Sequence, residues 1–591
     1  MEIFTLYFYS LLLEGDKLDA AGISVERNRE GLRSDLVDTY RKNQGFTEAG
    51  TPINRLRNEI YRDVISKVEA LDLNEKIYSL NVPTGTGKTL TSVSFALKLR
   101  ERISREDGIT PQIVYCLPFT SIIDQNYEVI SSVFSSAFPH GIPSDILLKH
   151  HHLTDISYTA SDDENYDEDL SRLLIEGWHS EFIITTFVQF FHTIISNKNR
   201  AIKKYHALAN SIIILDEVQS IPHHYWLLFH DLLQTVSCFL NIHVVFVTAT
   251  QPLIFDEEKK GEIRELASNK RDYFSRLDRI TLTFNREPKE IREFIKEIQD
   301  RIQTETGKDF LIVLNTIKSA KEVYRKLLSA SASDTDYIFL STHVIPKERL
   351  ARIRALRDPT NKKRKVIIST QLIEAGVDID VDVVYRDMAP LDSINQVSGR
   401  CNRNNREGAR GEVQIVTLKD KETKFWTLIY SSFLVDKTQI VLEGKDHISE
   451  QEFLKLNNQY FRLVKELHSE DPAQKCLELI RYLKFSEIHD TFHLIENDYP
   501  KMDVFIECDD NARMLWQKFL EIRSKNLPER RTDFLKIKRD FLDYVISGPE
   551  KDVKELFRED VGIGHISLEE LKIWYDPETG FTPNDGGTLI L

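Results

Sequence analysis

Cysteine is scarce in this chain, and long apolar runs are missing from it. The five cysteines are odd in number and scattered, with no Cys-x-x-Cys pair: Cys116, Cys238, Cys401, Cys476 and Cys508. That pattern argues against both a disulfide framework and a zinc site. The apolar stretch Phe4–Leu13 is shorter than the ~18 residues of a membrane span, and it lacks the basic start and the cleavage site of a signal peptide. We therefore expect a protein of the reducing cytoplasm with no membrane partner.

Basic residues are outnumbered by acidic ones, so the chain lacks the overall charge of a protein coated for nucleic-acid binding. The formal net charge is −15, with 78 lysines and arginines against 93 aspartates and glutamates. A local basic channel is compatible with this total, because binding depends on the field at the site. With 591 residues, of which 41% are hydrophobic and 29% charged, the composition is that of a globular protein with roughly three or four domains.

The segment Leu80–Thr89 has the pattern of a phosphate-binding loop. A short apolar strand leads into it, an apolar helix follows it, and glycines interrupt it. Such a loop wraps its backbone N–H groups around phosphates, while Lys88 reaches the β and γ oxygens and the Thr89 hydroxyl binds Mg²⁺. The strict pattern has a glycine where this chain has Val82, so an ordinary strand–turn–helix connection is the alternative. The residues expected to contact the nucleotide are Thr84, Gly85, Thr86, Gly87, Lys88 and Thr89.

A second element, Ile212–Gln219, argues against that alternative. Four apolar residues run into the acidic pair Asp216 and Glu217. Asp216 would hold Mg²⁺ through water, together with Thr89, and Glu217 would polarise the attacking water. A phosphate loop followed by such an acidic strand predicts that the chain binds and hydrolyses ATP.

Three further segments end predicted strands of the first half with hydroxyl groups. They are Tyr115–Ser121, Ile183–Phe191 and Phe246–Thr250. In a parallel sheet their carboxyl ends share one edge, where ligands bind, and hydroxyls and backbone N–H groups there suit phosphates. A plain buried strand end would explain any one of them, but it does not explain their order after the phosphate loop.

The second half repeats the pattern without a phosphate loop. Buried strands are predicted at Phe310–Thr316 and Lys365–Gln371. Downstream, the segment Gln396–Arg403 places Arg400 and Arg403 three residues apart, on what should be one face of a helix. Two guanidinium groups so placed can reach one triphosphate and stabilise charge on the transferring phosphoryl group. Solvated surface arginines are the alternative interpretation.

In this order the motifs resemble those of superfamily 2 helicases, over residues 50–435. The resemblance implies an α/β fold with two tandem RecA-like parallel-sheet domains, ATP in the cleft and nucleic acid across the top. The acidic motif ends in Gln219, where the large RNA-helicase groups have Asp or His. Together with Thr185–Phe190, the Ala-Thr-Gln-Pro run at 249–252 and the stretch Leu340–His343, it is similar to the Cas3 helicase–nuclease family of type I CRISPR systems.

The Cas3 resemblance implies an ATP-dependent helicase that moves along single-stranded DNA, with ATP and Mg²⁺ as cofactors. A surveillance complex with guide RNA would recruit it in a prokaryotic cytoplasm, because contacts to the sugar–phosphate backbone read no sequence. An RNA helicase of the same superfamily and a non-hydrolysing scaffold that recruits a separate nuclease are the alternatives. Gly376 and Asp378 are expected to contact the nucleotide, and Gln396 to help position the ATP site. Thr248 and Thr250 are expected to couple the ATP cleft to the nucleic-acid strand. Contacts to the sugar–phosphate backbone are expected from Thr120, Thr186 and Thr370.

The first residues resemble the end of the HD nuclease domain that precedes the helicase in this family. Leu6–Asp19 has the pattern of one apolar helix, and Asp16 stands where such domains carry a metal-binding aspartate. Neither a His-Asp dipeptide nor any histidine stands upstream of it, and a lone aspartate cannot assemble a two-metal site. We therefore expect the nuclease site to be absent from this chain, either truncated away or supplied by a separate HD nuclease subunit. A plain amphipathic docking helix is the alternative.

These anchors divide the chain into four predicted segments. They are 1–45 (HD-domain remnant or docking helix, and linker), 46–260 (the first, ATP-binding RecA-like domain), 261–435 (the second RecA-like domain) and 436–591 (linker helices and a small, mostly helical C-terminal domain). Thr51 and Pro52 mark the start of a helix whose apolar residues recur on one face. Three consecutive histidines, His150–His152, alternate between the faces of a strand, so we expect no metal site there.

Overall fold

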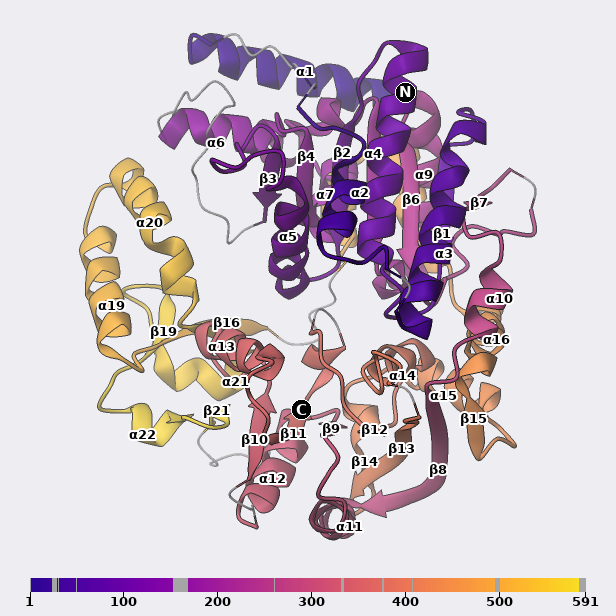
Figure 1. Ribbon diagram of the computed structural model, residues 1–591. Coiled ribbons are helices and arrows are strands. Elements are labelled where there is room, and N and C mark those ends of the chain that lie inside the picture. The colour runs from indigo at the N-terminus through magenta and orange to yellow at the C-terminus, as the bar shows by residue number, and fades with distance from the viewer. Residues whose placement is uncertain are drawn as a thin grey trace. The chain divides into compact units, whose positions relative to one another are not determined.

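The structure, a computed structural model, describes residues 2–23, 29, 31–48, 50–151, 168–259, 261–330, 334–374, 377–406, 408–494 and 500–583. The chain forms two compact units, whose elements are labelled in Figure 1. The first unit comprises Met1–Arg276 and Asn457–Glu496, and the second comprises Leu277–Leu456 and Asn497–Leu591. Each unit is built on a mainly parallel β-sheet, as predicted.

A seven-stranded parallel sheet forms the centre of the first unit, in the order β3-β4-β2-β5-β6-β1-β7. The isoleucine and valine side chains of its central strands are buried, as expected for a sheet covered on both faces. The carboxyl ends of these strands share one edge, so the phosphate loop after β1 and the acidic pair after β5 lie on the same side of the sheet. The strands are β1 (Ile77–Asn81), β2 (Gln112–Leu117), β3 (Leu147–His150), β4 (Phe182–Thr186), β5 (Ser211–Asp216), β6 (His243–Thr248) and β7 (Arg264–Glu265).

Helices α4, α5, α7 and α9 pack against this sheet. Helix α3 begins where the sequence predicts: the Thr51 hydroxyl accepts from the Asn54 N–H (3.3 Å), and Pro52 follows the cap. Its apolar residues, among them Ile60 and Val64, are buried. The helices are α1 (Glu2–Ala20), α2 (Leu36–Asn43), α3 (Pro52–Ser66), α4 (Lys88–Asp107), α5 (Thr120–Phe134), α6 (Glu168–Gly177), α7 (Phe187–Ile195), α8 (Asn199–Ile202), α9 (Trp226–Phe239) and α10 (Lys270–Ser275), with 3-10 turns η1 (Val68–Ala70), η2 (Tyr205–Leu208), η3 (Val218–Ser220) and η4 (His223–Tyr225).

Helix α1 joins the first unit through polar and apolar contacts. The buried Glu14 carboxylate lies 2.5 Å from His179 Nε2 and 3.5 Å from Lys203 Nζ. Phe8 and Leu12 on the same helix are 65% and 68% exposed. Asp16, the residue that resembles a metal ligand, is also exposed. Both the buried Glu14 carboxylate and the buried Leu6 side chain therefore attach this helix to the first unit.

A segment from the C-terminal half completes the first unit. The end of α16 (Phe453–Leu467), with α17 (Asp471–Arg481) and α18 (Phe485–Thr491), packs on α9 and the turn before it. The Trp226 ring lies 6.0 Å from Phe461 and 5.9 Å from His468, and Tyr225 lies 5.0 Å from Phe492. The predicted boundary at residue 435 does not anticipate this packing, because it depends on aromatic residues far apart in the sequence.

The second unit repeats the parallel α/β architecture, in the strand order β10-β11-β9-β12-β13-β8-β15 with β14 beside β13. Only the pairs made by β14 and β15 are antiparallel among these described strands. Phe294 of α11, Ile312 of β9 and Tyr324 of α12 belong to its core. The elements are β8 (Ile280–Glu290), α11 (Ile291–Thr304), β9 (Phe310–Val313), α12 (Ile317–Leu328), β10 (Thr335–Leu340), α13 (Pro346–Arg357), β11 (Arg364–Ser369), η5 (Gln371–Ile373), β12 (Val383–Asp387), α14 (Leu391–Ser398), β13 (Gly411–Asp420), β14 (Thr423–Lys424), η6 (Phe425–Leu428), α15 (Ser432–Val441), β15 (His447–Ser449) and η7 (Glu450–Glu452).

The C-terminal part of the second unit combines helices with a four-stranded sheet, β17-β16-β19-β18. Its aromatic core includes Trp516, which stacks on His565 at 3.9 Å and lies 5.2 Å from Phe505. The predicted C-terminal domain is therefore present, with a sheet that the sequence did not reveal. The elements are β16 (Lys501–Ile506), α19 (Asp510–Arg523), α20 (Leu527–Leu542), β17 (Val545–Pro549), α21 (Glu550–Val553), η8 (Lys554–Leu556), β18 (Phe557–Arg558), β19 (Ile563–Ile566), α22 (Leu571–Trp574), β20 (Tyr575–Asp576) and β21 (Gly580–Phe581).

The last hairpin, β20–β21, packs against the loop after β10 and against α12 of the same unit. The Phe581 N–H donates to the His343 carbonyl (2.9 Å), and the Phe581 carbonyl lies 3.0 Å from His343 Nδ1. Gly580 has φ +76°, and a β-carbon at this position would lie 2.2 Å from the His343 carbonyl oxygen. Both the backbone conformation and the close approach therefore require glycine here.

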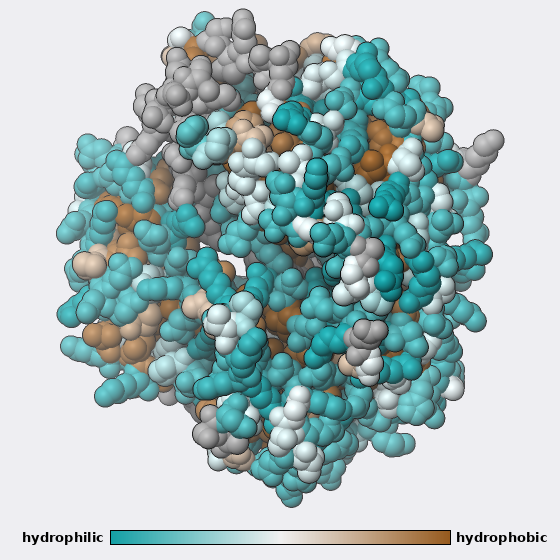
Figure 2. All heavy atoms as spheres, viewed as in Figure 1, coloured by the Kyte–Doolittle hydropathy of each residue, from teal (hydrophilic) through white to brown (hydrophobic). Residues whose placement is uncertain are grey.

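The surface carries mostly polar side chains on the face shown in Figure 2, where apolar residues form scattered patches. Within the described ranges, no helix is long and apolar enough to cross a membrane.

Candidate nucleotide-binding site

The loop between β1 and α4 has the backbone conformation of a phosphate cradle. Gly85 and Gly87 adopt φ values of +78° and +86°, in the left-handed region that favours glycine. The Thr86 hydroxyl donates to the Pro83 carbonyl (2.7 Å) and holds the turn. Helix α4 begins at Lys88, so its unpaired N–H groups and the positive end of its dipole face the loop.

Two contacts explain why the loop tolerates its departure from the strict pattern. Val82 is fully buried, and its N–H donates to the Thr248 carbonyl (3.2 Å), so a side chain fits where the motif has glycine. Arg57 of α3 donates through Nε to the Gly85 carbonyl (2.9 Å). These neighbouring elements therefore hold the loop in place.

Strand β5 brings the acidic pair next to Lys88. The Lys88 ammonium lies 3.8 Å from a Glu217 carboxylate oxygen. One Asp216 oxygen accepts from the Glu217 N–H (2.9 Å), and the other accepts from the Tyr115 hydroxyl (2.5 Å). Glu217 has φ +58°, a conformation that is uncommon outside glycine and recurs at active sites. The structure thus brings together the three residues expected to act on ATP.

The site offers ligands that fit a magnesium ion. Thr89 and Asp216 present a hydroxyl and a carboxylate, the hard oxygen donors that Mg²⁺ takes alongside water and phosphate oxygens. Burial, with the neighbouring Glu217 charge, raises the pKa of Asp216 to about 6, while Lys88 acts in the opposite direction. Over the ranges that the structure describes, no group of three or more His, Cys, Asp or Glu residues is placed to hold a metal.

A chain of hydrogen bonds links the acidic pair to the end of β6. Gln219 donates through Nε2 to Glu217 (2.5 Å), and its Oε1 accepts from the Thr248 hydroxyl (2.6 Å). The Thr250 N–H in turn donates to Thr248 Oγ1 (2.8 Å). The Thr250 hydroxyl is buried without a hydrogen-bond partner among the described residues. The two threonines expected to couple the site are therefore linked to Glu217, and Gln219 is the connecting residue.

The two candidate arginines lie in the second unit, beyond a helix rather than on it. Helix α14 ends at Ser398, and Arg400 and Arg403 follow in a turn in which Asn402 has φ +42°. The prediction that both share a helix face is therefore wrong, because the helix stops at its C-cap, Gly399. Gln396 remains on α14 and is half-buried.

Both arginines nevertheless bond to residues that follow β11, namely Glu374, Asp378 and Asp380. Arg400 Nη2 donates to the Glu374 carbonyl (2.7 Å), and Arg403 Nε lies 2.7 Å from Asp378. The Arg403 N–H donates to Asp380 (2.8 Å). Gly376, expected to contact the nucleotide, lies outside the described residues.

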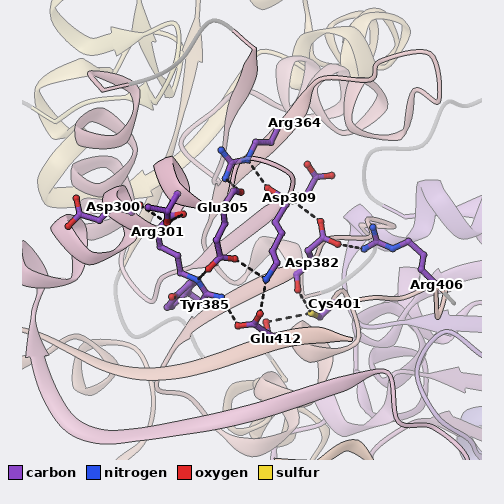
Figure 3. Close-up of polar contacts among 12 residues, drawn as sticks. Asp300, Arg301, Glu305, Asp309, Arg364, Asp382, Tyr385, Cys401, Arg406 and Glu412 are labelled. Carbon is purple, nitrogen blue, oxygen red and sulfur yellow. Dashed lines mark hydrogen bonds and ion pairs between the residues drawn. The ribbon is translucent and has the colours of Figure 1, made fainter. Parts of the chain in front are cut away.

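The turn that carries the arginines is anchored at the amino edge of the second sheet (Figure 3). The Cys401 thiol donates to the Asp382 carbonyl (3.3 Å), and the Arg406 guanidinium lies 2.6 Å from the Asp382 carboxylate. Asp382 also accepts from the Asp309 N–H (2.8 Å). Asp378, Asp380 and Asp382 thus alternate along one extended segment, and each holds a part of the arginine turn. The acidic alternation is visible in the sequence, but its partners are not.

Arg386 is a central residue that the sequence did not single out. It is fully buried, and it donates to Asn315 (2.7 Å), Glu374 (2.9 Å) and Tyr430 (2.7 Å). It also donates to Ser393 on α14 (2.9 Å). This side chain therefore ties together four segments around the candidate arginines. A lone arginine near the end of an apolar strand is the only signal that sequence offers for it.

The threonines expected to contact nucleic acid occupy strand ends and helix starts. Thr186 ends β4 and caps α7, since its hydroxyl accepts from the Gln189 N–H (3.1 Å). Thr120 is the first residue of α5 and is half-buried, while Thr370 follows β11 and is buried. Their positions at carboxyl edges agree with the prediction, and their contact with a strand stays a prediction.

Comparisons with known proteins give the chain its family context. Residues 58–257 match the model of the DEAD/DEAH box helicases, and residues 306–406 match the model of the C-terminal part of the CRISPR-associated nuclease/helicase Cas3. The chain resembles Cas3. The Cas3 proteins of Haloferax volcanii and Methanothermobacter thermautotrophicus are 28% and 25% identical, over 71% and 70% of this chain. The alignments cover 55% and 50% of those proteins, so the chain spans about half the length of the Cas3 relatives it matches.

Solved Cas3 structures confirm the fold. The crystal structure of T. fusca Cas3 aligns with a TM-score of 0.64 at 16% identity, over 91% of this chain and 71% of that one. Its ATP complex aligns with a TM-score of 0.60 over 85% of this chain and 67% of that one, again at 16% identity. These likenesses confirm the two tandem RecA-like domains of the Cas3 type.

Proposed function

We propose that this chain is the ATP-dependent helicase of a type I CRISPR system, a translocase on single-stranded DNA. The observation that carries the proposal is the arrangement of Lys88, Asp216 and Glu217 at one sheet edge, beside a phosphate cradle. The Cas3 resemblance of both RecA-like domains supports it. The solved T. fusca Cas3 complexes with ATP and AMPPNP support ATP as the nucleotide.

The first unit would bind the triphosphate and activate water. The N–H groups of the loop 84–87 and the Lys88 ammonium would hold the phosphates, and Thr89 and Asp216 would hold Mg²⁺. The ion would neutralise charge on the phosphates. Glu217, which Lys88 and Gln219 orient, would take a proton from the attacking water.

The second unit would supply positive charge to the transferring phosphoryl group. We assign this to Arg400 and Arg403, which bond to Glu374 and Asp378 respectively. Asp378 restrains the Arg403 guanidinium, which would leave this carboxylate to bind the phosphate. Thr120, Thr186 and Thr370 would contact the sugar–phosphate backbone without reading sequence.

Sequence selection would come from a partner. A solved surveillance complex in its pre-nicking state contains a chain similar in fold to this one, with a TM-score of 0.58 at 14% identity. We propose that this chain acts with such a guide-RNA complex in a prokaryotic cytoplasm.

ATP hydrolysis with different nucleic acids tests the proposal. The purified chain is assayed with Mg²⁺ alone, with single-stranded DNA and with single-stranded RNA. Glu217→Gln serves as the inactive variant, and Glu258→Gln, at an exposed glutamate of the same unit, serves as the matched control. We expect single-stranded DNA to stimulate ATP hydrolysis, and we expect Glu217→Gln to abolish that hydrolysis. Stimulation mainly by RNA would favour an RNA helicase, and nucleotide binding without hydrolysis under all three conditions would favour a non-hydrolysing scaffold.

A further inference from the structure

Two side chains outside the phosphate loop and the acidic strand touch the expected magnesium ligands. Tyr115 lies in β2 and Asn126 in α5, the strand and helix that follow the phosphate-loop helix in the chain. Neither belongs to a motif assigned above to ATP. Tyr115 bonds to Asp216, and Asn126 bonds to Thr89.

Tyr115 fixes one oxygen of Asp216. Its hydroxyl is fully buried and donates to Asp216 Oδ2 at 2.5 Å, a short distance typical of a charge-assisted bond. The ring is held by partial stacking on Phe182 at 6.4 Å. The second Asp216 oxygen accepts from the Glu217 N–H, so the carboxylate cannot rotate without losing a bond. One lone pair on each oxygen stays available to a metal-bound water.

Asn126 fixes the direction of the Thr89 hydroxyl. The Thr89 Oγ–H donates to Asn126 Oδ1 (3.3 Å), while Asn126 Nδ2 donates to the Ile122 carbonyl (3.1 Å). The second bond determines which end of the amide faces Thr89. Because the hydroxyl proton points at Asn126, the oxygen lone pairs point elsewhere, as a metal ligand requires. Ile123 and Ile130 are fully buried and seat α5 on the sheet.

We propose that Tyr115 and Asn126 are positioning residues that hold Asp216 and Thr89 in the orientation that binds Mg²⁺. The inference rests on the proposed function, since it concerns the ion that accompanies ATP. The two residues approach the ion site from a strand and a helix whose junction the sequence assigns to nucleic-acid contact. In the absence of metal, the loop and Lys88 would bind the nucleotide without a contribution from these two residues.

The test compares nucleotide binding with and without metal. Binding of a fluorescent ATP analogue to the full chain is measured in EDTA and across a Mg²⁺ titration, for Tyr115→Phe, Asn126→Ala and Glu217→Gln. Tyr127→Phe is the matched control, because it removes a phenol hydroxyl from α5 at the residue next to Asn126, where the ring faces Lys149 instead. Tyr115→Phe keeps the ring and loses only the hydroxyl, which contacts both Asp216 and Thr89. Circular dichroism and thermal melting check that each variant folds.

In the Mg²⁺ titration, the affinity for the ATP analogue rises with Mg²⁺. Tyr115→Phe and Asn126→Ala are each expected to raise about tenfold the Mg²⁺ concentration that gives half of this rise, as changes to residues that orient metal ligands do. Affinity in EDTA should match the unmodified chain, and Tyr127→Phe should match it in both conditions. An unchanged Mg²⁺ dependence in a folded variant would overturn the proposal, as would an equal loss of affinity in EDTA. If one variant does not fold, the Mg²⁺ dependence of nucleotide binding by the other variant tests the proposal. Failure of the unmodified chain to bind nucleotide even with Mg²⁺ would instead reject the proposed function, and this inference with it.

Discussion

Replacing Arg386 by methionine should destabilise the second unit strongly. Arg386 is fully buried and donates to Asn315, Glu374, Ser393 and Tyr430. Removing it leaves the Glu374 carboxylate, whose pKa burial already raises, without its cation. Breaking one side of a buried ion pair costs about 3–5 kcal/mol of the free energy of unfolding. For a unit of this size that corresponds to a fall of about 6–20 °C in Tm.

Differential scanning calorimetry resolves this effect if the two units melt separately, and the assay should follow the second unit's transition. Arg410→Met is the matched control, since Arg410 is half-exposed and pairs with Asp278 at the surface; surface pairs contribute only about 0–1 kcal/mol. The double variant Arg386→Met with Glu374→Gln should recover part of the loss, because the Glu374 charge that lost its cation is removed as well. A loss in Arg386→Met no larger than in Arg410→Met would refute the reasoning.

Two further predictions concern the terminal hairpin. Gly580→Ala should destabilise the hairpin's attachment by about 2 kcal/mol or more, because the left-handed conformation and the 2.2 Å approach to the His343 carbonyl exclude a β-carbon; limited proteolysis of residues 571–583 reports it, and a cleavage rate like that of the unmodified chain would contradict it. Burial, with the nearby Lys321 charge, lowers the pKa of His343 from 6.5 to about 3. The contribution of the neutral His343 to the free energy of unfolding is therefore fully present above about pH 6.5 and is lost as the pH falls toward 3. Unfolding free energy should fall by about 1.4 kcal/mol per pH unit in that window; His343→Asn should flatten this dependence while the exposed control His447→Asn should not, and equal slopes in both variants would exclude the mechanism.

The sequence alone was sufficient for the features that depend on neighbouring residues. The phosphate loop, the acidic pair and the cap of α3 are local arrangements, in which glycines, a threonine cap and an apolar run act within a few positions. Parallel strands follow from buried β-branched runs separated by helices. Since the carboxyl ends of such strands share an edge, the meeting of Lys88 with Glu217 was also predictable.

Local patterns misled where the chain changes direction. The spacing of Arg400 and Arg403 is helical, yet α14 ends at Ser398 because Cys401 pairs with the backbone near Val381 and the aspartates of that segment hold the turn. The same limit hid the packing of α17 and α18 on the first unit, which aromatic contacts across the chain produce.

The sequence by itself predicted the two RecA-like domains, and it predicted which loop and which carboxylates would form a nucleotide site, because those signals are carried by short runs of residues. Only the tertiary structure showed what holds these groups in place. Tyr115 reaches Asp216 from the neighbouring strand, Asn126 reaches Thr89 from the next helix, and Arg386 joins four segments. A hydrogen bond between distant residues depends on strand order and burial, and neither is written in the residues that make it.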